Sequence, residues 1–176
     1  MHRWLAACTC LVLVGCSPSS GAAIPSPSPS PFVGGSPSGA AVKMAGGCGA
    51  TQVYKGGEPD WLTQAGDNNN PKDLPYFITD LPIAAGFIFG YPLHARVSPG
   101  QGNKILWVVG IPRNEEDLHV TGHPLGASEP VVRMTFPPNS SPGEIYPSEV
   151  DVLSPGCWHF DLTWGPNKTT VDLVYA

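Results

Sequence analysis

The fold is decided by Ser154-Pro155-Gly156-Cys157-Trp158-His159-Phe160-Asp161-Leu162-Thr163-Trp164. In this stretch a Pro-Gly turn is followed by large apolar side chains that alternate with polar or smaller ones. A period of two is typical of an antiparallel strand with one face in the core and the other in water. We therefore predict a strand over residues 157–164, and its core face carries Trp158, Phe160, Leu162 and Trp164.

The next residues predict the second strand of a hairpin. Gly165-Pro166-Asn167-Lys168 has the composition of a turn, and the alternation resumes over residues 169–175 with apolar side chains at every second position. A third strand, over residues 104–110, contributes one more large apolar side chain to the predicted core. The core positions are Trp107, Trp158, Phe160, Leu162, Trp164, Val171 and Leu173.

Short apolar segments separated by Pro and Gly fill the rest of residues 48–176. Besides the three strands already named, further strands are expected at residues 84–91, 93–97, 117–122, 131–136 and 148–153. Their number and spacing favour a single all-β domain, an antiparallel β-sandwich of immunoglobulin-like type. No segment has helical periodicity. Residues 58–75 are interpreted as a polar loop with a turn near Trp61 and Leu62, and Trp61 is expected to be exposed.

Residues 1–15 have the pattern of an export signal. Met1-His2-Arg3 carries one Arg, and Trp4 begins an uncharged run of 11 residues. A helix of that length spans about 17 Å, too little for about 30 Å of hydrocarbon, so a signal is favoured over a membrane span. Leu13-Val14-Gly15-Cys16 resembles the lipobox of bacterial lipoproteins, and this resemblance implies that Cys16 is lipidated and becomes the new N-terminus. The alternative is an ordinary signal peptide with an incidental Cys.

Residues 16–47 are predicted to form a disordered tether. Of residues 17–47, 25 are Ser, Pro, Gly or Ala, and such a composition buries too little apolar surface to offset the entropy of ordering. With a lipid on Cys16, the tether would attach the domain to the outer face of the bacterial cytoplasmic membrane.

The cysteine count predicts one disulfide. Two of the five Cys residues lie in the signal and one is the lipidation site, which leaves Cys48 and Cys157. An even pair in an oxidising compartment favours a disulfide over two free thiols or two metal ligands. Since Cys157 lies on the strand face opposite Trp158, we expect the bond to join the N-terminal segment to the C-terminal hairpin and not to cross the core.

Three segments carry a resemblance to a family of uncharacterised secreted bacterial lipoproteins. They are Lys104-Ile105-Leu106-Trp107-Val108, Leu118-His119-Val120-Thr121-Gly122 and Pro155-Gly156-Cys157-Trp158. The resemblance covers residues 48–176 and implies an exported immunoglobulin-like domain that closes in a Pro-Gly-Cys-Trp β-hairpin. It implies no activity and no catalytic residues.

Charge and motifs argue against nucleic acid and against catalysis. Without Arg3, the mature chain has eight basic and 14 acidic residues, and the basic ones occur singly, so a nucleic-acid partner is not expected. There is no Gly-x-Ser-x-Gly motif, and Glu115, Glu116 and Asp117 are consecutive acids, which usually form a solvated face or a weak Ca²⁺ contact. We expect a non-enzymatic protein without a cofactor.

The histidines are the candidates for a metal site, above all His119 and His123, with His94 and His159 as additions. On a straight strand, residues i and i+4 lie about 13 Å apart, so the chain would have to turn for one ion to reach both. The alternative is two solvated histidines, and no metal site is assigned. Blue copper on Cys157 and His159 is disfavoured because no Met follows them and a disulfide would remove the thiolate.

Two functions remain as hypotheses. In the first, a membrane-anchored extracytoplasmic lipoprotein uses its β-sandwich as a non-catalytic domain that binds another protein or a cell-wall component. In the second, the lipoprotein handles copper or zinc through its surface histidines. Metal titration distinguishes the two.

Overall fold

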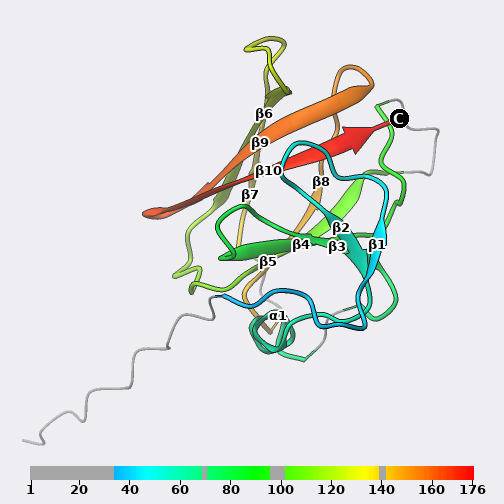
Figure 1. Cartoon of the computed structure of the whole chain (residues 1–176). Coiled ribbons are helices and arrows are strands. Elements are labelled where there is room, and N and C mark those ends of the chain that lie inside the picture. Colours follow the sequence, from blue (N-terminus) through cyan, green and yellow to red (C-terminus); the bar gives the residue numbers. More distant parts are fainter. Residues whose placement is uncertain (1–33, 69–70, 96–101, 139–141) are drawn as a thin grey trace, which may run out of the picture.

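The computed structural model describes residues 34–68, 71–95, 102–138 and 142–176, so the predicted signal and Cys16 lie outside the described residues. Ten strands form two antiparallel sheets, and the described residues contain one short helix (Figure 1). This part of the chain is all-β, as predicted. None of its helical residues form a segment long and apolar enough to cross a membrane.

The larger sheet has six strands in the order β1-β2-β3-β4-β5-β8. Its first five strands follow one another along the chain as a meander, and β8 then pairs with β5 at the far edge. The strands are β1 (Val42–Met44), β2 (Val53–Lys55), β3 (Pro75–Ile78), β4 (Ala84–Ile88), β5 (Lys104–Val109) and β8 (Ile145–Glu149).

The smaller sheet has the order β10-β9-β6-β7 and contains the hairpin that the sequence predicts. Its strands are β6 (Leu118–Pro124), β7 (Val132–Phe136), β9 (Gly156–Trp164) and β10 (Asn167–Tyr175). Trp164 pairs with Asn167, so the turn consists of Gly165 and Pro166 alone, and Gly165 has a φ of 50°. Such a φ suits glycine, which has no Cβ to clash.

The inner faces of both sheets share one hydrophobic core. The expected core residues Trp107, Trp158, Phe160, Leu162, Trp164, Val171 and Leu173 are all buried in it. Gly122 on β6 lies beneath the ring of Phe160, where an added Cβ would overlap the ring atoms. A glycine on β6 therefore lets the large side chain of β9 pack across the neighbouring strand.

A second cluster covers the other face of the larger sheet, and it corrects the prediction for residues 58–75. Helix α1 (Asp60–Ala65) packs there against Tyr76, Phe87 and Val108, and Trp61 is only 6% exposed. The prediction of an exposed Trp61 is therefore wrong. Six residues make fewer than two turns, too few for a helical period to be recognised in the sequence.

Other differences concern the ends of elements. The strand expected at 148–153 is instead Ile145–Glu149. Within the expected strand 93–97, residues 93–95 form no strand, although Leu93 and Ala95 bond to the backbone of Ala176. Strands β1 to β3 were not predicted, and β1 lies inside the expected tether, so the ordered domain begins before residue 47.

The expected disulfide is present between Cys48 and Cys157. Residues 46–48 lie along β10 at the edge of the smaller sheet, where the N–H of Val174 donates to the carbonyl of Gly46 at 2.8 Å. The bond thus joins the N-terminal segment to the C-terminal hairpin on the outer face of the sheet, as predicted from the alternation.

Candidate metal-binding site

The outer face of the smaller sheet carries the polar half of each alternating strand. The strand register sets His123 of β6 opposite His159 of β9, and His159 opposite Asp172 of β10. Asp161 follows His159 by two residues on β9 and so lies on the same face. Pairing of three strands thus gathers two imidazoles and two carboxylates that are far apart in the sequence.

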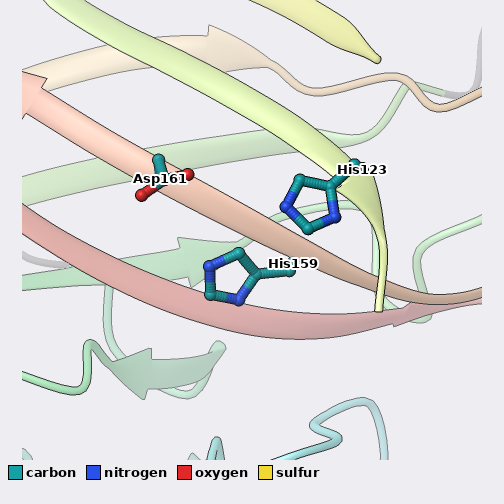
Figure 2. Close-up of side chains that lie close together, drawn as sticks. All are labelled: His123, His159 and Asp161. Atoms are coloured by element: carbon teal, nitrogen blue, oxygen red, sulfur yellow. The ribbon is translucent and has the colours of Figure 1, made fainter. Parts of the chain in front are cut away.

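His123, His159 and Asp161 form the candidate site. One potential ligand atom of each lies within 4.8 Å of the others, and all three residues are half-buried. The imidazole rings have centroids 5.2 Å apart. Figure 2 shows the rings side by side across the β6–β9 pair, with Asp161 further along β9.

Each imidazole has a partner on Nδ1. His159 Nδ1 lies 2.6 Å from the Oδ1 of Asp172, and His123 Nδ1 lies 3.1 Å from the carbonyl oxygen of Pro124. Carboxylate and carbonyl oxygens accept hydrogen bonds and do not donate them, so in the neutral rings the proton belongs on Nδ1. The lone pair of each Nε2 is then available to a metal ion. In metal sites a histidine ligand usually donates its other ring N–H to a carboxylate or a backbone carbonyl, which fixes the orientation of the ring.

Asp161 already has a cationic neighbour. Lys168 Nζ lies 2.9 Å from the Oδ1 of Asp161, but the Lys168 side chain is 63% exposed. An ion pair at such a surface contributes only about 0–1 kcal/mol, so a divalent ion can displace the ammonium group.

Two imidazoles and one carboxylate form a donor set suited to Zn²⁺ or Cu²⁺. Ligand atoms about 2.0–2.1 Å from one tetrahedral ion are about 3.3 Å apart, so the side chains must close in by rotation from their present spacing. Three protein ligands leave a further coordination position for water or for a donor atom from another molecule.

The structure does not bring together His119 and His123, the two histidines that the sequence named first as metal candidates. Strand β6 continues through Pro124 without the turn that would bring His119 and His123 together, and the His119 ring bonds instead to the hydroxyl of Thr135 at 3.0 Å. His94 precedes β5, and its backbone is held by the side chain of Asn103. The partner of His123 is His159, which the sequence named only as an addition.

Two other candidates fit the predictions made for them. Cys157 forms the disulfide with Cys48, so it has no thiolate to offer a blue-copper site. Glu115, Glu116 and Asp117 are exposed in the turn before β6. The missing signal for the site was the pairing of β6 with β9, which depends on strand order and cannot be read from the spacing of residues in either strand.

No protein-family model, no curated protein and no solved structure matches the chain. The resemblance to a family of secreted lipoproteins therefore stays a prediction. The function has to be argued from the residues of this chain.

Proposed function

We propose that this chain is a lipid-anchored extracytoplasmic lipoprotein whose immunoglobulin-like β-sandwich is a non-catalytic binding domain for a divalent transition-metal ion, Zn²⁺ or Cu²⁺. The observation that carries the proposal is the convergence of His123, His159 and Asp161. Asp172 is bonded to Nδ1 of His159, which leaves Nε2 to face the other two residues.

The chemistry of the face supports a cation as the ligand. Asp161 and Asp172 bring two negative charges and Lys168 one positive charge, so the group has an excess of negative charge. Both histidines have their Nδ1 directed at an oxygen atom, so each ring in its neutral form presents the lone pair of Nε2 to an ion. A sheet face fixes these donors more firmly than a loop would.

The location is supported by the sequence and the disulfide. The apolar N-terminal run, the Leu13-Val14-Gly15-Cys16 motif and the Ser/Pro-rich segment together favour export and lipidation. A disulfide between Cys48 and Cys157 fits an oxidising compartment. The immunoglobulin-like type is supported by two antiparallel sheets between which the chain crosses after β5, β7 and β8.

Isothermal titration of the full chain with Zn²⁺ and with Cu²⁺ tests the metal site. We expect one binding event that the double variant His123→Ala/His159→Ala abolishes. The matched control is His94→Ala/His119→Ala, which also removes two imidazoles but none from the site, and it should bind as the wild type does. Cys8, Cys10 and Cys16 are common to all three proteins, so any binding to them cancels in the comparison. Equal isotherms for the wild type and His123→Ala/His159→Ala would contradict the proposal.

The anchor has its own test. In cells, Cys16→Ser should abolish labelling with a lipid precursor and release the protein from the membrane. Persistent lipid labelling of Cys16→Ser would show that Cys16 is not the acceptor.

A further inference from the structure

Residues 46–51 cap the edge of β10 beside the candidate site. The N–H of Cys48 donates to the carbonyl of Asp172 at 3.3 Å, and the N–H of Asp172 donates to Thr51 Oγ1 at 2.8 Å. A further bond of 2.9 Å, from the N–H of Thr51 to the carbonyl of Cys48, closes the segment into a turn. Both the N–H and the carbonyl of Asp172 are therefore hydrogen-bonded to this turn.

The same turn also holds the carboxylate of Asp172. Its Oδ2 accepts a hydrogen bond from the N–H of Ala50 at 3.4 Å, while Oδ1 is bonded to His159. Gly49 has a φ of 55° and lies so close to this carboxylate that a Cβ would overlap it. The Asp172 side chain is only 14% exposed. Each of its oxygens thus has its own partner, one in the turn and one in the metal site.

The disulfide joins this turn to the strand that carries the site. Cys157 precedes His159 by two residues on β9, so both side chains lie on the outer face. The chain of contacts runs from Cys48 through the disulfide to β9 and His159, then through Asp172 and Thr51 back to Cys48. A closed ring of this kind restricts the rotation of the His159 imidazole more than a single surface hydrogen bond would.

We infer that Asp172 is a positioning residue for the metal site, and that the disulfide-anchored turn at residues 48–51 acts through Asp172 to hold His159 with its proton on Nδ1 and its Nε2 facing the metal. The effect on metal affinity rests on the proposed function, whereas the effect on the imidazole does not. Removal of a carboxylate behind a histidine ligand typically weakens metal binding by about 10–100-fold. We expect a loss of that order for Asp172→Asn.

The first test is made without metal, on the full chain. Long-range ¹H–¹⁵N correlation spectra of the imidazoles, recorded where His159 is neutral, report which nitrogen carries the proton. We expect Nδ1–H in the wild type and a shift toward Nε2–H in Asp172→Asn and in Thr51→Val. Thr51→Ser keeps the hydroxyl and should restore the wild-type spectrum. An Nε2–H ring in the wild type, or an unchanged His159 spectrum in both variants, would overturn the inference.

The second test is the metal titration of the same proteins. Asp80→Asn is the matched control for charge, because Asp80 and Asp172 line the same hollow of about 360 Å³. The Asp80→Asn substitution removes the same negative charge as Asp172→Asn but leaves the partner of His159 in place. We expect Asp80→Asn to bind like the wild type and Asp172→Asn to bind more weakly. Asp161→Asn should also weaken binding but leave the His159 proton on Nδ1, because Asp161 is a ligand and not a positioning residue.

The two proposals fail in different ways. A wild type that binds no metal contradicts the proposed function, and the spectra without metal still decide whether Asp172 orients His159. A wild type that binds metal with the same affinity as Asp172→Asn contradicts the inference alone.

Discussion

Removal of the disulfide is the sharpest test of how the domain is stabilised. The bond links residues 109 positions apart, and a cross-link that closes a loop of about 100 residues lowers the entropy of the unfolded chain by an amount worth about 4.7 kcal/mol. This is close to the whole stability of many small domains, which is about 5–15 kcal/mol. We expect Cys48→Ala/Cys157→Ala to lose about 3–5 kcal/mol of unfolding free energy.

The assay is equilibrium unfolding in urea, followed by tryptophan fluorescence, since Trp107, Trp158 and Trp164 are buried in the core. The cross-link also keeps the unfolded wild type more compact, which changes the slope of the transition. Free energies extrapolated to zero urea must therefore be compared, and not midpoints alone. Wild-type protein that has been reduced should match the double variant, which separates the loss of the cross-link from any effect of the alanine side chains.

A loss below about 1 kcal/mol would refute this reasoning, because the entropic effect of so long a loop cannot be that small unless the unfolded chain is already held together. The unfolding free energy does not report whether the turn at residues 48–51 stays in place without the bond, and the His159 spectrum of the double variant measures that separately.

Three further predictions use the same unfolding assay. Trp158→Ala should cost about 3–5 kcal/mol because its side chain is fully buried, and a near-neutral result would contradict the core assignment. Gly122→Ala should cost about 1–3 kcal/mol because the new methyl group overlaps the Phe160 ring, and unchanged stability would show that the ring moves freely. Burial raises the pKa of Tyr146 to about 12 and also raises the pKa of Tyr175. Unfolded tyrosines lose their protons near pH 10, so stability should be intact below about pH 10 and fall as the pH rises toward 12, by up to about 1.4 kcal/mol per pH unit for each tyrosine. A flat profile to pH 12 would count against buried phenols.

The sequence was most informative where an alternating pattern is long. Strands β9 and β10 have nine residues each, and their alternation predicted the hairpin, the core face and the face of the disulfide. Strands β1 and β2 have three residues each, too few to show a period of two, and both were missed. Trp61 was misplaced for a related reason, because nothing in a polar, Asn-rich segment indicates that a short helix will be packed against a sheet.

The candidate metal site could be predicted only in its parts. His123, His159 and the Asp residues are visible as polar positions on alternating strands, but their contacts depend on β6 lying beside β9. That neighbour relation joins residues about 40 positions apart and follows from the packing of two sheets, which no local pattern determines. The sequence therefore offered His119 as the partner of His123, the nearest histidine along the chain and the wrong one in space.

Strand β9 contributes side chains to the core, to the disulfide and to the candidate metal site. The register of its pairing therefore determines the geometry of the candidate site. The inner positions of β9 are Trp158, Phe160, Leu162 and Trp164, and its outer positions begin with Cys157, His159 and Asp161. If β9 slipped by one residue in its pairing, every side chain of the strand would move to the opposite face of the sheet. The polar side chains of His159 and Asp161 would then be buried, and the free energy needed to remove them from water makes this register unfavourable. The tryptophans on one face therefore fix the register that sets His159 opposite His123 and Asp172 on the other. The proposed metal site lies on an open sheet face and needs no cavity, because the core beneath that face holds His123, His159 and Asp161 in position.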